Sequence, residues 1–186
     1  ERMEAILRRE KPDRVPFCPV AGGFVSVYSG GDKTDEYTRS PKVKYEREKK
    51  TCHDFDWVFV PAYRALRSNT GMFGGEIKIP TSKYGPYSPS ITRYAAETAE
   101  EVMALKKPDV KALYSPLMDA YQESFQDEDD NKPFKLDIGC LSVMNTAADI
   151  AGYDKLCKWM LQKPEVAHRL VRLASDYLIE TAQYFK

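Results

Sequence analysis

Apolar and polar residues alternate along the chain in two rhythms. Three short apolar runs have the length and composition of buried strands, and amphipathic stretches lie between and after them. In those stretches apolar residues recur every three or four positions, as in a helix with one buried face. Strands that alternate with helices are typical of a parallel sheet covered by helices. The pattern therefore predicts an α/β fold with core strands at residues 15–20, 55–60 and 136–141.

Capping residues locate several of the predicted helices. Ser40-Pro41 supplies an N-cap and a first-turn proline, and Ser115-Pro116 is a similar start. Thr98 and Glu101 have the spacing of a capping box. The predicted helices cover residues 2–9, 42–52, 100–105, 114–126, 154–161 and 166–185, and a predicted hairpin joins residues 76–80 and 90–94.

The segment from residue 136 onwards organises the predicted site. Its apolar run is a buried strand, and residues 142–152 are predicted to form a loop before the C-terminal helices. In parallel α/β proteins, ligands bind at the carboxyl ends of the strands. The residues at or after the carboxyl ends of the three predicted strands are therefore candidates for substrate binding. They are Gly22, Gly23, Tyr63, Arg64, Cys140 and Asn145.

Each candidate also has a purely structural interpretation. Cys140 fits a buried core cysteine, Gly22-Gly23 a flexible turn, and Arg64 a charge that solvates a loop. His168 is interpreted as a surface or helix-packing residue. Cys52-His53 is a poor zinc motif because no further ligand follows at a suitable spacing. The sequence alone assigns no catalytic residue and no metal ligand.

Composition narrows the classes of partner. The 186 residues contain 28 Lys and Arg against 28 Asp and Glu, so the charge gives no support for binding to nucleic acid or to an anionic membrane. No apolar run approaches the roughly 18 residues of a membrane-spanning helix. The four cysteines are widely spaced and form no Cys-x-x-Cys pair, which favours reduced thiols and a cytoplasmic protein.

Three segments, taken in order, resemble one known family. Residues 2–16 (RMEAILRREKPDRVP), 100–109 (EEVMALKKPD) and 151–170 (AGYDKLCKWMLQKPEVAHRL) are similar to successive motifs of the uroporphyrinogen decarboxylase superfamily. The resemblance implies a (β/α)8 TIM barrel, of which residues 1–186 would be the N-terminal portion of a single domain. Both ends of the chain fall inside predicted helices. We therefore expect a fragment of a longer protein, with an incomplete barrel that is inactive alone.

The resemblance also indicates a branch of the family. True decarboxylases carry an arginine-rich loop after the first strand, an Asp after the second, and a Tyr before the glycine that matches Gly152. Here those places hold residues 21–24 without an Arg, Pro61-Ala62-Tyr63, and Ala148. Porphyrinogen decarboxylation is therefore not expected. The chain looks closer to the corrinoid-dependent methyltransferases of the methylcobamide:coenzyme M type.

The methyltransferase branch implies specific cofactors and partners. Zinc is expected in a C-terminal half outside this chain, where it would activate a thiolate. A corrinoid would carry the methyl group, a corrinoid protein and a small methyl donor or acceptor would be partners, and a homodimer is an open option. The alternatives are a decarboxylase-like lyase that acts on a non-porphyrin substrate, and a non-catalytic relative that binds a tetrapyrrole or a corrinoid protein.

Overall fold

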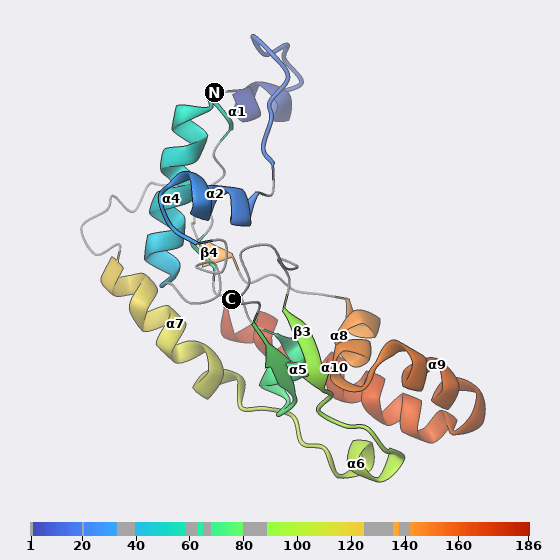
Figure 1. Ribbon diagram of the computed structural model, residues 1–186. Helices are drawn as coiled ribbons and strands as arrows, with labels where there is room; N and C mark the ends of the chain where they lie inside the picture. Colours follow the sequence, from blue (N-terminus) through green and yellow to red (C-terminus); the bar gives the residue numbers. More distant parts are fainter. Residues whose placement is uncertain are drawn as a thin grey trace. The chain divides into compact units, whose positions relative to one another are not determined.

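The structure is a computed structural model that describes residues 2–19, 21–32, 40–58, 63–64, 68–79, 89–124, 136–137 and 142–186 (Figure 1). For residues 63, 64, 124, 136 and 137 it describes the backbone only. These parts of the chain are mostly helical. The elements are α1 (Arg2–Leu7), α2 (Gly22–Tyr28), α4 (Pro41–Asp54), β1 (Tyr63–Arg64), α5 (Asn69–Met72), β2 (Glu76–Lys78), β3 (Ser90–Arg93), α6 (Ala99–Ala104), α7 (Val110–Ser124), β4 (Leu136–Asp137), α8 (Val143–Ala151), α9 (Tyr153–Gln162) and α10 (Pro164–Tyr184).

The chain divides into two compact units. Unit 1 comprises Glu1–Ala65, Thr81–Tyr87 and Ser124–Ile138, and unit 2 comprises Leu66–Pro80, Ser88–Glu123 and Gly139–Lys186. Unit 1 therefore holds α1, α2, α4, β1 and β4, whereas unit 2 holds the hairpin and the C-terminal helices. The prediction of a single domain over residues 1–186 stays a prediction.

In unit 1 the helix α4 begins where the sequence predicts. Ser40 Oγ accepts a hydrogen bond from the Val43 backbone N–H at 3.4 Å, and Pro41 occupies the first turn. Tyr45 and Cys52 face inward, at 3% and 6% exposed, and α2 packs against α4. The helix continues to Asp54, two residues beyond the predicted end.

The predicted strands of unit 1 are shorter than expected and displaced. Val58 N–H donates to the Phe17 carbonyl at 2.9 Å, so the first two apolar runs are neighbours, but their described residues form no ladder. Pro16 and Pro19 remove two ladder donors from the first run. The second run starts at Phe55, the C-cap residue of α4, and the next residue, Asp56, has a φ of 50°. Regular pairing begins only at β1.

The one parallel pair in the described residues joins β1 to β4. Tyr63 pairs with Leu136 and Arg64 with Asp137. This pairing places the residues after the second apolar run beside the start of the third, in the parallel orientation that the α/β interpretation requires. The described fold is thus α/β in its parallel pairing, with far more helix than strand.

Ion pairs connect α1 to the turn that follows α4. Both Arg2 Nε and Nη2 donate to the Asp13 carboxylate at 2.7 Å, and Arg2 Nη1 reaches Asp56 Oδ1 at 3.0 Å. Arg14 pairs with the same Asp56 side chain. The hydrogen bonds from Arg2, more than any other contact, lower the pKa of Asp13 to about 2.

In unit 2 the hairpin is where the sequence predicts. Strands β2 and β3 are antiparallel, with Ile77 opposite Ile91 and Lys78 opposite Ser90. The following helix α6 has the predicted capping box, because Thr98 Oγ1 accepts from Glu101 N–H at 3.2 Å while the Glu101 carboxylate accepts from Thr98 N–H at 3.1 Å.

Two predicted boundaries in unit 2 are wrong. Helix α7 begins at Val110 rather than at residue 114, because the Asp109 carboxylate accepts from Ala112 N–H at 3.0 Å and caps the earlier turn. Pro116 therefore lies inside the helix. Residues 143–151, predicted as part of a loop, form the helix α8, which Ser142 Oγ caps by accepting from Asn145 N–H at 3.2 Å.

The core of unit 2 lies along α10. This helix packs against α6, α8 and α9, and Leu170 and Ala174 are fully buried in it. Tyr177 is 1% exposed, and its hydroxyl lies 2.9 Å from that of Tyr114. The pair satisfies two buried hydroxyl groups that would otherwise be costly.

Gly152 sets the angle between α8 and α9. Its φ is +96° and its ψ is 141°, a conformation open almost only to glycine. A Cβ there would lie 2.9 Å from Asp154 Oδ1 and 3.3 Å from the Tyr94 ring.

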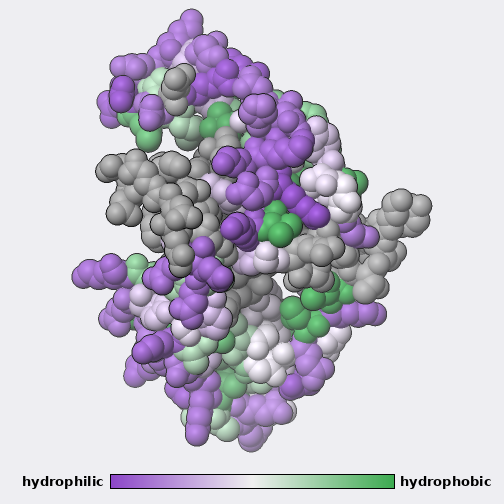
Figure 2. Space-filling model, turned by 90° about the vertical axis from the view of Figure 1, so that its left-hand side faces the viewer, coloured by the Kyte–Doolittle hydropathy of each residue, from purple (hydrophilic) through white to green (hydrophobic). Residues whose placement is uncertain are grey.

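The surface of the molecule is mixed in character. Figure 2 shows one face, on which hydrophilic side chains prevail and hydrophobic ones surface in patches. Among the described residues, no helix is both long and apolar enough to cross a membrane.

We expect Gly152→Ala to destabilise the chain by about 2–4 kcal/mol, through backbone strain and overpacking together. Gly74→Ala is the matched control, since Gly74 has a similar φ of +94° but a Cβ at that position would have no neighbour within 4 Å. It should cost only the backbone share, about 1–2 kcal/mol. Urea unfolding followed by circular dichroism measures both. Equal losses would contradict the close contact at Gly152.

The Arg2–Asp13 pair should fail in acid. Because the folded-state pKa of Asp13 is about 2 and the ordinary value is about 3.9, its stabilising contribution is present above pH 4 and is lost as the pH falls toward 2. The stability difference between the native chain and Asp13→Asn should therefore vanish between about pH 4 and pH 2. A difference that persists at the acid end would show that another interaction is responsible.

Candidate functional site

Backbone contacts link the three apolar runs within unit 1. The Val58–Phe17 backbone hydrogen bond joins the first run to the second, and the β1–β4 pair joins residues 63–64, which follow the second run, to Leu136 and Asp137 at the start of the third. Tyr63 and Arg64 are the two residues of β1. Their backbone therefore lies beside the first two residues of the third run, and the direction of their side chains lies outside what the structure describes.

Gly22 and Gly23 do not form the predicted turn. They are the first two residues of α2, with Ala21 at its N-cap position, and both are partly buried. The glycines are helical because the chain continues into a helix whose Val25 and Ser26 are buried. Val25 N–H donates to the Ala21 carbonyl at 2.8 Å, so the glycines are held within a hydrogen-bonded turn.

The other two candidates belong to unit 2. Asn145 is exposed on the first turn of α8, not in a loop, and its backbone N–H is bound to Ser142 Oγ. Cys140 lies outside the described residues. The structure therefore brings none of the six candidate side chains into a described contact with another, and the predicted substrate-binding roles stay predictions.

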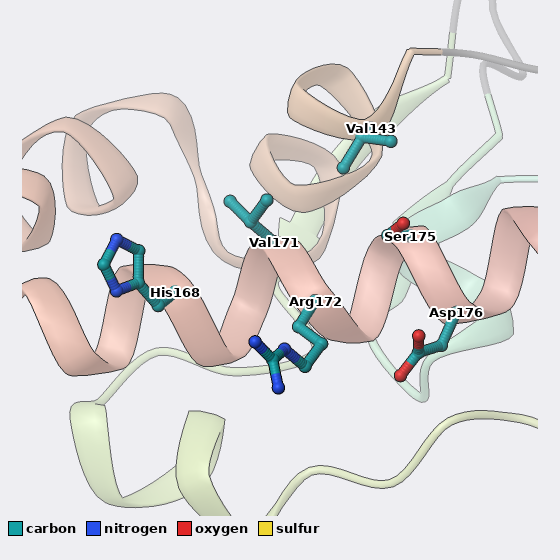
Figure 3. A pocket seen from close by; sticks show the side chains of 6 residues that line it. All are labelled: Val143, His168, Val171, Arg172, Ser175 and Asp176. Atoms are coloured by element: carbon teal, nitrogen blue, oxygen red, sulfur yellow. The ribbon is translucent and has the colours of Figure 1, made fainter.

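A cavity of about 670 Å³ lies between α8 and α10 (Figure 3). Val171 and Ser175 of α10 turn toward Val143 of α8, whereas Arg172 and Asp176 project from the other edge of α10. Thr146, three residues after Val143 on α8, is fully buried, and its Oγ1 has no hydrogen-bond partner among the described residues. The complete lining is Val143, His168, Val171, Arg172, Ser175 and Asp176.

This cavity has polar groups of several kinds but no described nucleophile–base pair. A guanidinium, an imidazole, a hydroxyl and a carboxylate can hydrogen-bond a small polar molecule. The sequence interpretation missed the site, although it placed His168 at the surface correctly. The available signal was the spacing of His168, Arg172 and Asp176, which are four residues apart and so share one side of a helix.

A second cavity, of about 760 Å³, lies along α4 in unit 1. Cys52 lines it, and burial raises the pKa of that thiol to about 11, with smaller contributions from Glu48 and Cys18. A neutral thiol is a poor nucleophile and a poor metal ligand. The lining is Glu46, Lys49, Lys50, Cys52, His53, Asp56 and Trp57.

The described residues contain no cluster of three or more His, Cys, Asp or Glu side chains that could hold a metal ion. The weak Cys52-His53 motif accordingly gains no further ligand within the described part of the chain. The His53 side chain is exposed, and its Nδ1 lies 3.5 Å from Oδ1 of Asp54, the next residue in the sequence.

Comparisons with known proteins place the chain among relatives. The family model described as uroporphyrinogen decarboxylase (URO-D) matches residues 1–185. No curated protein matches the sequence. A solved structure of a methyltransferase from Methanosarcina mazei is similar, with a TM-score of 0.65 and 18% identity over 95% of this chain and 52% of the methyltransferase. The chain thus spans about half the length of that protein, and the likeness is one of fold.

Thiol alkylation should separate the cysteines. At mildly alkaline pH we expect iodoacetamide to modify the exposed Cys18 and Cys157 well before Cys52, because the thiolate is the reactive form and Cys52 has a pKa of about 11. Peptide mapping by mass spectrometry gives the rate at each site. In urea the rates should converge. Native-state modification of Cys52 as fast as that of Cys157 would contradict its burial.

Proposed function

The chain belongs to the uroporphyrinogen decarboxylase family, and from this premise we propose that it forms the N-terminal portion of a (β/α)8 barrel in a methyltransferase. The enzyme moves a methyl group to or from a corrinoid protein. The barrel is supported by the parallel β1–β4 pairing, by helices between the apolar runs, and by the fold similarity to the Methanosarcina mazei methyltransferase.

The observation that carries the choice of branch is the side chain at position 148, where the resemblance places a Tyr in true decarboxylases. Ala148 has no polar group, and it is 1% exposed on the buried side of α8 beside the fully buried Ala147. A phenol ring would not fit this packing without displacing its neighbours. The position therefore favours chemistry other than porphyrinogen decarboxylation.

The residues after the first apolar run also argue against porphyrinogen decarboxylation. A porphyrinogen presents several carboxylates, which require cationic partners. Residues 21–24 contain no arginine, and two described arginines of unit 1, Arg2 and Arg14, are engaged by Asp13 and Asp56. The segment at which the resemblance places the substrate carboxylates thus lacks arginine, the cation that would pair with them.

The proposal assigns substrate positioning, rather than bond making, to this chain. Tyr63 and Arg64, which form β1, would shape the site together with Gly22, Gly23, Cys140 and Asn145. The described residues contain no cluster that could hold zinc, so the zinc expected for this branch would be bound by residues other than those described. In the reaction a thiol would lose its proton to solvent, and the thiolate sulfur would take the methyl group of the methylcorrinoid substrate. The electron pair of the broken cobalt–carbon bond would stay on the corrinoid, which would leave as cob(I)alamin or its corrinoid equivalent.

A decarboxylase-like lyase that acts on a non-porphyrin substrate is the second candidate. The family model that matches residues 1–185 favours this candidate, because the family is named after a decarboxylase. The two candidates differ in what they release, since a lyase yields carbon dioxide and a methyltransferase yields a methylated acceptor.

The test uses the gene product at its full encoded length. With methylcobalamin and the thiol 2-mercaptoethanesulfonate, we expect loss of the methylcobalamin absorbance and formation of one thioether per cobalamin, measured by mass spectrometry. Uroporphyrinogen, incubated in parallel, should stay unchanged. Carbon dioxide release from a carboxylated substrate without thioether formation would favour the lyase and overturn the proposal.

Arg64→Met should lower kcat/KM at least about tenfold, the loss expected when a charged hydrogen bond of roughly 1.5–3 kcal/mol to substrate is removed. Arg8→Met is the matched control, because Arg8 is exposed just beyond α1 and has no assigned role. Steady-state assays with methylcobalamin measure both variants. Unchanged kinetics in Arg64→Met would remove Arg64 from the site.

A further inference from the structure

The short helix α5 is held against α8 by a single half-buried aspartate. Asn69 Nδ2 donates to Asp149 Oδ2 at 3.0 Å, and Thr70 Oγ1 donates to the backbone carbonyl of the same Asp149. Thr70 is 1% exposed, so this second contact is buried. All three residues belong to unit 2, in which α5 and α8 pack together. Two elements that are far apart in the sequence are therefore joined at one residue of α8.

The place of α5 depends on contacts of this kind. The helix has four residues, whereas helices shorter than about 12–15 residues are marginal without tertiary packing. Ser68 Oγ accepts from Gly71 N–H at 3.3 Å and so stabilises the turn itself. That cap lies within one turn and does not fix where the turn lies. The hydrogen bonds to Asp149 do, because they reach another element.

The Asp149 carboxylate stands where a helix disfavours negative charge. Helix α8 ends at Ala151, so Asp149 lies in its last turn, near the negative end of the helix dipole. The backbone carbonyl of Asp149 already has an outside donor in Thr70 Oγ1, as a carbonyl in the last turn needs. The end of the helix therefore does not call for the carboxylate. A side chain that opposes the local preference is expected where function requires it.

Asp149 connects segments that follow two of the strands in the chain. Asn145, a candidate for substrate binding, is four positions earlier on α8 and so lies on the same side of that helix. Asn69 opens the first described helix after β1, the strand formed by Tyr63 and Arg64. In parallel α/β enzymes the segments after the strands surround the substrate. The Asn69–Asp149 bond thus fixes one such segment on another.

We propose that Asp149 is a positioning residue for the methyl transfer proposed above. It orients the Asn69 carboxamide and holds α5 on α8, so that the segment after β1 keeps a fixed place while substrate is bound. The inference rests on the proposed function. Asp149 acts through Asn69 and touches no reacting atom. Its effect belongs in kcat rather than in KM, because a small displacement of a bound substrate slows the chemical step while most binding contacts persist.

Three variants separate the hydrogen bond from the residues that make it. Asn69→Asp removes the donor and places two carboxylates side by side, which repel each other. Asp149→Asn alone is milder, because an amide oxygen can still accept, though without the added strength of a charged acceptor. The double variant Asn69→Asp with Asp149→Asn exchanges donor and acceptor, so a charged hydrogen bond re-forms in the reverse direction.

Hydrogen exchange measures the hold on α5 without an assay of activity. The amides of Met72, Phe73 and Gly75 donate within this turn, at 3.0, 3.1 and 2.8 Å. In Asn69→Asp they should exchange at least about tenfold faster, because local opening of α5 becomes easier. The double variant should return to the native rate, and peptides from α9 should not change in either variant. Native exchange at α5 in Asn69→Asp would overturn the proposal.

The kinetic test uses the full-length protein with methylcobalamin and 2-mercaptoethanesulfonate. Asn69→Asp should lower kcat about tenfold or more while KM for each substrate changes less than about twofold, and the double variant should recover most of the loss. Asp119→Asn is the matched control, because Asp119 is exposed on α7 and has no assigned role. Circular dichroism should report native helix content in every variant. A raised KM with unchanged kcat, or a double variant as slow as Asn69→Asp, would overturn the positioning role.

The two proposals fail in different ways. If the native full-length protein forms no thioether, the methyltransferase proposal fails, and the role of Asp149 in that reaction fails with it. If the native protein is active and Asn69→Asp has the same kcat, only the positioning role fails.

Discussion

The buried stripe of α10 is the constraint on which unit 2 depends. Leu170, Ala174 and Tyr177 are at most 1% exposed, and α6, α8 and α9 all pack against this helix. Tyr177 adds hydrogen bonds to these apolar contacts. Its hydroxyl group lies 2.9 Å from that of Tyr114 and 3.4 Å from Met72 Sδ. Elements far apart in sequence are thereby fixed on one helix.

The sequence predicts best those elements whose ends are set by local chemistry. Ser40 and Thr98 cap α4 and α6 as expected, since an N-cap depends only on residues within one turn. Helix α8 was not predicted because its small residues, such as Ala147 and Ala151, were interpreted as a loop. The predicted limits of the strands in unit 1 are wrong for another reason. Their pairing partners, such as Leu136, lie far away in sequence, so local residues do not set where a strand begins or ends.

Of the candidate site, the sequence predicts the parallel sheet that would carry it. The β1–β4 pair is parallel as expected, but Tyr63 and Arg64 pair with the first residues of the third run, and their place in a site stays a prediction. The cavity beside His168 and Arg172 was not predicted, since it depends on how α8 and α10 pack rather than on either helix alone. Packing also decides which apolar residues of α9 are buried, since Leu156 and Trp159 lie inward whereas Leu161 is exposed.

The distribution of contacts along the chain has a consequence for the order of folding. The helices α8, α9 and α10 lie consecutively in residues 143–184 and pack on one another, so their contacts close short loops. The β1–β4 pair joins residue 63 to residue 136, and its loop-closure entropy must be met before any sheet contact forms. The C-terminal helices should therefore assemble early as a local nucleus, and the parallel strands should pair late.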